Sequence, residues 1–154
     1  MYTPRTDRKI LIAGHLLRQS MMGSDLSYED MMEDHKLSNA YAATLEGYED
    51  FEGKRLAILH LIAYDKKTTY QTRKAWVNPE NKTVLKEERF AKSGKILKRI
   101  LFKDYEEIAG RIFPRTMIFK DLLKKNTKTT YKFDVIEFDV EIPGRYFSQS
   151  ILKR

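Results

Sequence analysis

Short runs of β-branched and aromatic residues, broken by turn residues about every ten positions, most limit what this chain can fold into. The pattern starts after Asn39 and is typical of an antiparallel meander, in which each strand pairs with the next one along the chain. We therefore predict a mainly β fold of seven or eight strands. The predicted segments are Lys9 to Ala13, Ser38 to Tyr48, Lys54 to Tyr64, Thr69 to Val77, Thr83 to Ala91, Ile96 to Lys103, Arg111 to Lys120 and Lys128 to Ile142.

Turn-forming residues separate these segments. Residues 50–53 (DFEG), residues 78–81 (NPEN) and the pair Ser93-Gly94 tolerate positive φ or preset a turn. The Ser93-Gly94 link is short enough to pair the two strands that flank it directly. It predicts a hairpin between Thr83 and Lys103.

The segment from Leu56 to Ala63 is apolar on both faces apart from His60, so we expect it to be covered on both sides. We interpret His60 as a hydrogen-bonded structural residue rather than a metal ligand. This stretch is the longest nearly apolar run in the chain. It is far shorter than the ~18 residues that a membrane-spanning helix needs.

Helix signals are few. Ser27 followed by Asp30 forms an acidic variant of the capping box and predicts a helix of two turns through Met31 and Met32. At the carboxyl end Pro143-Gly144 ends the last strand. Phe147 and Ile151 lie one helical turn apart, which predicts a short terminal helix that docks through these two side chains.

The length of 154 residues, at 18.2 kDa, fits one domain. The net charge of +7 is unevenly distributed, −5 over residues 1–53 and +12 over residues 54–154. It admits an anionic partner such as nucleic acid or a phospholipid surface and does not choose between them. Zero cysteines exclude a disulfide framework and a thiol nucleophile. The opening MYTPRTDRK lacks the features of an export signal, so the chain is either cytoplasmic or a trimmed part of a longer protein.

Sequence signatures of catalysis are absent. The chain contains no G-x-S-x-G motif, no P-loop and no G-x-G-x-x-G, so we expect no enzyme activity and no cofactor. An acidic cluster lacks the alternating oxygen ligands and central glycine of a calcium loop, and we interpret it as a solvated helix terminus rather than a metal site. The cluster consists of Asp25, Glu29, Asp30, Glu33, Asp34 and His35.

Basic strands with interleaved aromatic residues are one alternative, because such strands bind single-stranded nucleic acid through stacking and phosphate contacts. The residues of suitable type are Tyr70, Arg73, Trp76, Lys98, Arg99, Phe102 and Lys132. The same pattern also arises when lysines and arginines occupy the solvated face of antiparallel strands. We favour that second interpretation and expect no nucleic-acid partner.

The run GSDLSYEDM at residues 23–31 resembles the G-S-D-F-S-Y-E-D-L signature of outer-membrane lipoprotein-sorting proteins, the LolA-like family. Leu26 replaces the usual aromatic residue. Further matches extend over nearly the whole chain. They comprise Tyr2, Pro4 and Arg8 to Ile12; Gly94, Lys95, Leu97 and Lys98; Pro114, Met117 and Thr127 to Thr130; Phe138, Asp139, Ile142 and Pro143; and Phe147, Ser148, Leu152 and Arg154.

The resemblance implies a strongly curved antiparallel sheet, an incomplete barrel, that holds acyl chains on its concave face under short helical segments. It implies a non-enzymatic periplasmic carrier of lipids or lipoprotein acyl chains to the outer membrane, with an inner-membrane transporter as a partner. We interpret residues 1–154 as one LolA-like domain, the carboxyl-terminal part of a longer protein. A structural envelope domain without a ligand is a further alternative. Open sheet edges predict self-association through an edge strand.

Alternation along the strands nominates one apolar trough for cargo. Its predicted lining residues are Leu56, Ile58, Ile62, Tyr70, Trp76, Ile100, Phe102, Met117 and Phe119. A lid over the trough is predicted from the motif residues Gly23, Ser24, Asp25, Leu26, Ser27, Tyr28, Glu29, Asp30, Met31 and Met32, with Met21 and Met22 beside them. Methionine suits such a lid because its flexible side chain adapts to variable shapes.

Overall fold

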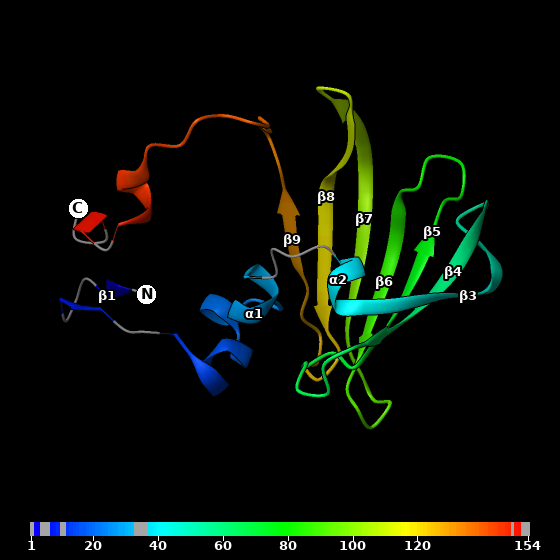
Figure 1. Ribbon diagram of the computed structural model, residues 1–154, viewed down its shortest axis with the longest axis horizontal. Coiled ribbons are helices and arrows are strands. Elements are labelled where there is room, and N and C mark those ends of the chain that lie inside the picture. Colours follow the sequence, from blue (N-terminus) through cyan, green and yellow to red (C-terminus); the bar gives the residue numbers. More distant parts are fainter. Residues whose placement is uncertain (1, 4–6, 10–11, 33–36, 149, 152–154) are drawn as a thin grey trace.

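Seven antiparallel strands form one sheet in which every strand pairs with its neighbour in sequence (Figure 1). The computed structural model describes residues 2–3, 7–9, 12–32, 37–148 and 150–151. The strands of the sheet, in spatial order, are β3 (Tyr41–Phe51), β4 (Lys54–Ala63), β5 (Thr72–Val77), β6 (Val84–Phe90), β7 (Ile96–Ile108), β8 (Arg111–Asp121) and β9 (Thr129–Lys132). The predicted meander is therefore confirmed, including the hairpin of β6 and β7.

The sheet is curved and does not close into a barrel, because β3 and β9 are its two outer strands and do not pair with each other. Register shifts interrupt the pairing near Gly47, between Trp76 and Val77, and between Arg89 and Phe90. β-bulges of this kind bend a strand and increase its local twist. The predicted open, strongly curved sheet is thus confirmed.

Three predicted segments of the sheet need correction. Residues 37–40 form a one-turn helix, α2 (Leu37–Ala40), where a strand was expected from Ser38. β7 continues to Ile108, five residues beyond the predicted end. The strand predicted for Lys128 to Ile142 is reduced to β9, because the Arg115 guanidinium binds the carbonyl groups of Phe133 and Asp134 and the chain then leaves the sheet.

The predicted first strand, Lys9 to Ala13, is wrong in its extent. A separate hairpin pairs β1 (Tyr2–Thr3) with β2 (Arg8–Lys9), while Ile12 and Ala13 lie in no regular element. Residues 10 and 11 of that prediction lie outside the described residues. The hairpin forms no part of the seven-stranded sheet.

Short helices precede the sheet: η2 (Gly14–Arg18), η3 (Met21–Gly23) and α1 (Tyr28–Met31). The predicted capping box of Ser27 and Asp30 is confirmed, but α1 makes one turn instead of two. The carboxyl-terminal helix is η4 (Gly144–Phe147), and Phe147 is 76% exposed, so the predicted docking of this helix through Phe147 is wrong. Within the described ranges, no helix has both the length and the apolar character to cross a bilayer.

Strand pairing separates the side chains of the sheet into two faces. We call the face on which Leu26 packs the covered face; it carries the buried clusters Leu26–Ile100–Phe119 and Tyr41–Leu61–Ala75. The opposite face carries the cluster Leu56–Ile58–Trp76. The β4 strand contributes Leu56 and Ile58 to one cluster and Leu61 to the other, which confirms cover on both sides for this part of the strand. Ile62, on the opposite face, is 50% exposed, so the predicted cover does not reach the end of β4.

Candidate functional site

Asp30, the third residue of α1, joins this helix to the covered face. Its carboxylate accepts hydrogen bonds from Lys98 Nζ at 2.7 Å, from Arg89 Nη1 at 3.0 Å and from the Tyr70 hydroxyl at 2.7 Å. The backbone N–H of Ser27 donates to the same carboxylate at 2.7 Å, which completes the capping box. One short motif thus caps its own helix and binds three residues of the sheet and the loop before β5.

The Asp30 contacts continue into a chain of buried ion pairs. Arg89 Nε donates to Glu87 Oε1 at 2.8 Å, and Arg73 Nη1 donates to the same oxygen at 3.0 Å. All five side chains are at least nine-tenths buried. We call this group the ion network; its members are Asp30, Arg73, Glu87, Arg89 and Lys98.

Opposing effects set the pKa of Asp30. Burial alone raises the pKa of this carboxyl, but the hydrogen bond and charge of Lys98, the Ser27 N–H and the charge of Arg89 together lower it below its ordinary value. The Tyr70 hydroxyl shows the complementary effect: burial first, and then the neighbouring Asp30 carboxylate, raise its pKa. Asp30 is therefore ionised and Tyr70 is a hydrogen-bond donor at neutral pH.

Asp25 anchors the same segment to the β8–β9 turn. Its carboxylate accepts hydrogen bonds from Thr127 and Thr129 and from the backbone N–H of Asp121, at 2.8 to 3.1 Å. The Asp25 carbonyl oxygen accepts a further bond from Lys98 Nζ at 2.7 Å. Burial acts to raise the pKa of Asp25, but these donors outweigh it and the pKa is lowered.

The interpretation of the acidic cluster as a solvated helix terminus is therefore wrong for Asp25 and Asp30, whose side chains are buried and bonded to the sheet. Glu29 bonds the Thr69 hydroxyl at 2.8 Å. Glu33, Asp34 and His35 lie outside the described residues. Among the residues that the structure describes, no three histidine, aspartate or glutamate side chains are grouped so that they could hold a metal ion.

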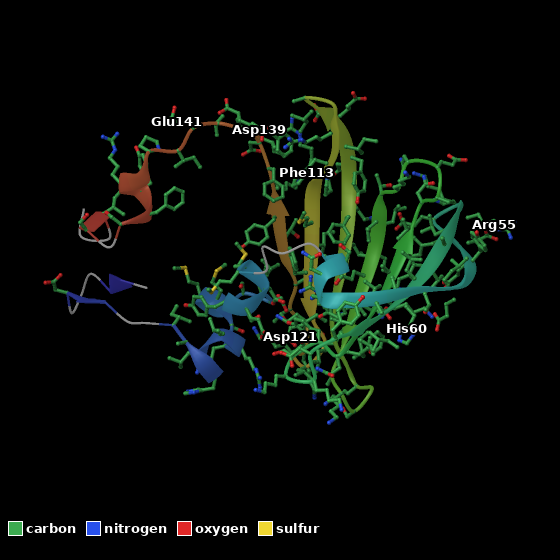
Figure 2. All side chains as sticks on the ribbon, in the orientation of Figure 1. Arg55, His60, Phe113, Asp121, Asp139 and Glu141 are labelled. Carbon is green, nitrogen blue, oxygen red and sulfur yellow. The ribbon has the colours of Figure 1, made fainter. Side chains whose placement is uncertain are left out.

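Aromatic rings follow one another along β8 and β9 on the covered face. Phe119 packs edge-to-face on Tyr131, Tyr131 stacks on Phe133, and Phe113 contacts both Phe133 and Phe138, with ring centroids 5.7 to 6.5 Å apart. We call these five residues the aromatic ladder. Phe119 is buried, whereas the other four rings are half-buried. Figure 2 shows Phe113 and Asp139 near the upper end of the sheet, far along the strand from Asp121.

The nine residues of the predicted trough do not share one face. Ile100, Phe102, Met117 and Phe119 lie on the covered face with Leu26. Leu56, Ile58, Ile62 and Trp76 lie on the opposite face, because Ile58 pairs with Trp76, while Ala57 and Leu59 point to the covered side. Tyr70 precedes β5 and turns to the covered side, where it binds Asp30. The single trough is thus corrected to two separate apolar surfaces.

The predicted lid residues lie over the covered face in two groups. Leu26 is buried against Ile100 and Phe119, and Ser24, Asp25, Ser27 and Asp30 hold the segment by hydrogen bonds. Met22, Met31 and Met32 are exposed, and the Met31 sulfur lies 4.0 Å from the Tyr131 hydroxyl. Gly23 ends η3, and Tyr28 begins α1.

Two small cavities flank the ion network. One, about 210 Å³, is lined by residues that include Ser27, Tyr70 and Lys98, and the other, about 260 Å³, by residues that include Met32, Tyr41 and Arg73. Ligand cavities usually measure about 300–1,000 Å³. Both cavities are therefore smaller than a usual ligand cavity.

Sequence reasoning identified Asp30 as a capping residue but missed the ion network around it. Arg73, Glu87, Arg89 and Lys98 alternate with other charged residues on their strands, so their sequence pattern is that of solvated side chains. No local pattern shows the network, because only the pairing register places Arg73 opposite Arg89, and Arg89 opposite Lys98. Three buried cations in a row on one face need carboxylates between them.

A family model covers residues 1–154, and its family is described as an uncharacterized protein family. The chain belongs to that family. A search of curated proteins gave no match.

Solved structures with the same fold include three proteins. A DUF1329 family protein from Desulfovibrio piger is 26% identical, with a TM-score of 0.85 over 98% of this chain and 62% of its own. A domain from Vibrio parahaemolyticus, named for outer membrane lipoprotein sorting, is 24% identical, with a TM-score of 0.81 over 99% of this chain and 64% of its own. A LolA superfamily protein from Nitrosomonas europaea is 23% identical, with a TM-score of 0.72 over 88% of this chain and 60% of its own.

These matches confirm the resemblance to the LolA-like family at the level of the fold. The chain spans about three fifths of the length of each of these three proteins.

Proposed function

We propose that this chain is a non-enzymatic carrier that binds the acyl chains of lipids or lipoproteins on the covered face of its sheet. The observation that carries the proposal is the aromatic ladder, which continues the buried Leu26 cluster along β8 and β9 as a half-buried apolar surface. The exposed Met31 side chain, at the end of α1, stands beside it with its sulfur 4.0 Å from the Tyr131 hydroxyl.

Burial energetics suit this role. Each methylene removed from water contributes about 0.8 kcal/mol, so an acyl chain laid along several rings binds without any bond being made. The same cargo leaves when an acceptor offers more apolar area. Flexible methionine side chains accommodate cargo of different shapes. A carrier of this kind needs no catalytic residue and no cofactor.

Charge limits the proposed binding surface to part of the covered face. Along the middle of β7 the covered face presents Ile100 and Phe102, whereas Arg99 and Lys103 alternate with them on the opposite face. On β5 and β6 both faces carry charge, because the ion network occupies the covered face and Lys74, Lys86 and Glu88 the opposite one. Ionised side chains lose hydration under a buried alkyl chain, so we assign the cargo to the aromatic ladder and the adjoining part of β7, away from the ion network.

The structural neighbours support the broader part of this proposal. One is named for outer membrane lipoprotein sorting and another for the LolA superfamily. We infer a periplasmic location and delivery to the outer membrane, and the resemblance of the sequence to the LolA-like family adds an inner-membrane transporter as a proposed partner.

Nucleic-acid binding loses support from the geometry. Arg73 and Lys98, two of the basic residues in that hypothesis, are buried in the ion network and are paired with carboxylates. Neither side chain reaches a phosphate without breaking these pairs. The alternative that remains is a structural envelope domain that binds no apolar ligand.

Neighbouring residues of β8 offer a matched pair of variants for the test. Phe113 belongs to the aromatic ladder, and Ile112, the preceding residue, points to the opposite face and is exposed. We expect Phe113→Ser to weaken binding of a fluorescent long-chain fatty acid at least about fivefold, and Ile112→Ser to leave it within about twofold. Thermal unfolding of both variants checks that the fold is kept.

Equal losses in the two variants would show that the ladder is not the binding surface. If the wild-type chain binds no fatty acid, and native mass spectrometry of the purified protein finds no lipid, the structural alternative holds instead.

A further inference from the structure

The two ends of the sheet differ strongly in charge. Because the strands alternate in direction, the turns within residues 64–71, 91–95 and 120–128 lie at one end of the sheet, and those within residues 50–55, 78–83 and 104–111 lie at the other (Figure 1). Each range includes the strand residues next to its turn. The first set carries eight lysines and two aspartates, a net charge of +6. The second set carries four basic and six acidic residues, a net charge of −2. We call the first set the basic end.

The lysines of the basic end are available to a partner. Seven of the eight are exposed, and within the described part of the chain none of these seven forms an ion pair. They are Lys66, Lys67, Lys92, Lys95, Lys120, Lys125 and Lys128. The eighth, Lys124, donates to Ser20 and to the Ser24 carbonyl. The positive charge of this end is therefore not neutralised by neighbouring carboxylates.

Exposed apolar side chains lie among these lysines. Tyr64, at the start of the β4–β5 loop, is 64% exposed, and Leu123, between Lys120 and Lys125, is 57% exposed. Lysines that surround a tyrosine and a leucine match the boundary of a lipid bilayer, where ammonium groups meet phosphates and apolar side chains enter the headgroup region. A purely ionic partner gains nothing from exposed Leu123.

We propose that the basic end docks on a membrane surface rich in anionic phospholipid headgroups. Three turns at one sheet end form a broad surface, and the opposite charge at the far end orients the molecule in the field of the membrane. Docked this way, α1 and the ion network lie near the bilayer, since Lys98 and Asp121 both contact the α1 segment close to these turns. The inference is independent of acyl binding, because it concerns headgroups and a different set of residues.

The test is co-sedimentation of the purified chain with vesicles of phosphatidylcholine containing about 30% phosphatidylglycerol, and with pure phosphatidylcholine vesicles. We expect binding to the anionic vesicles only, and a loss of at least about tenfold when salt rises from about 50 mM to about 300 mM. The combined variant Lys66→Glu, Lys92→Glu, Lys125→Glu should lose at least about tenfold in binding. The combined variant Lys54→Glu, Arg55→Glu, Lys82→Glu changes the charge equally at the far end and should stay within about twofold.

A second pair of substitutions separates a lipid surface from other polyanions. Tyr64→Ser with Leu123→Ser keeps every charge and should weaken vesicle binding about threefold while the melting temperature stays near that of the wild type. Equal losses for the two charge-reversal variants would overturn the proposal. Binding to pure phosphatidylcholine as strong as to anionic vesicles, or tighter binding to a single-stranded oligonucleotide than to anionic vesicles, would also overturn it.

Discussion

Asp30→Asn tests whether the ion network holds α1 on the sheet. Asparagine has nearly the same shape and keeps an oxygen that accepts the Ser27 N–H, so the helix cap survives. The substitution removes the charge that pairs with Lys98 and Arg89. It also places an NH₂ group where Oδ1 accepts from Arg89 and from the Tyr70 hydroxyl, whereas the oxygen that faces Ser27 still accepts from Lys98. The variant therefore removes the charge and one acceptor while it keeps the helix cap.

The expected loss follows from the burial of the groups. The Asp30 side chain is 2% exposed, and those of Lys98 and Arg89 are 9% exposed. Removing one member of a buried ion pair costs about 3–5 kcal/mol, because the remaining charges stay buried without a counter-ion. Arg89 keeps its bond to Glu87, and Lys98 keeps the Asp25 carbonyl, so we expect the lower half of this range. A loss of about 3–4 kcal/mol lowers the melting temperature by roughly 6–16 °C for a chain of this size.

Urea unfolding followed by far-UV circular dichroism measures the change. Asp139→Asn is the matched control, since Asp139 pairs with Arg111 on the surface with its side chain 79% exposed, and it should not change the midpoint measurably. A Lys98→Met variant completes a double-mutant cycle with Asp30→Asn, and we expect a coupling of at least about 1.5 kcal/mol. An Asp30→Asn loss below about 1 kcal/mol would refute the reasoning.

Other predictions concern pH, the opposite face, a turn and the sheet edge. Because folding lowers the pKa values of Asp30 and Asp25, their contribution to the unfolding free energy is complete above the unfolded pKa of about 4 and is lost as the pH falls through the lower folded values. Acid unfolding should therefore begin below about pH 4, and Asp30→Asn should make the unfolding free energy depend less on pH in this range. Trp76→Phe removes the 3.0 Å hydrogen bond from the indole N–H to the Glu49 carboxylate. We expect the unfolding free energy to fall by about 1–2 kcal/mol and fatty-acid binding to stay unchanged, because Trp76 lies on the opposite face. Gly94→Ala should lower the unfolding free energy by about 1 kcal/mol, because Gly94 has a φ of +79°, which an L-residue adopts only with strain. A Cβ at this position meets no atom within 4 Å, so the φ angle is the whole cause, and an unchanged free energy in urea unfolding would contradict this turn geometry. The free edge of β3 should promote self-association, and a strict monomer in light scattering at high concentration would count against it.

Local signals in the sequence were sufficient for the elements themselves. The period-2 pattern and the turn residues located all seven strands of the sheet, and Ser93-Gly94 identified the β6–β7 hairpin, because side-chain alternation and turn conformation depend on residues close together in sequence. The capping box was found for the same reason, since Ser27 and Asp30 bond each other within one turn. The length of α1 was not, because packing against the sheet decides where so short a helix ends.

The tertiary structure alone decided which strands share a face and which charges are buried. Alternation groups Leu56 with Ile58, and Ile100 with Phe102. Only the registers of the successive pairs β4–β5, β5–β6 and β6–β7 show that these two sets point to opposite faces of the sheet. A lysine in a strand looks the same in sequence whether it is solvated, as Lys120 is, or buried against an aspartate, as Lys98 is. Asp30 is 68 residues from Lys98 along the chain, and such a contact depends on the curvature of the whole sheet rather than on any local pattern.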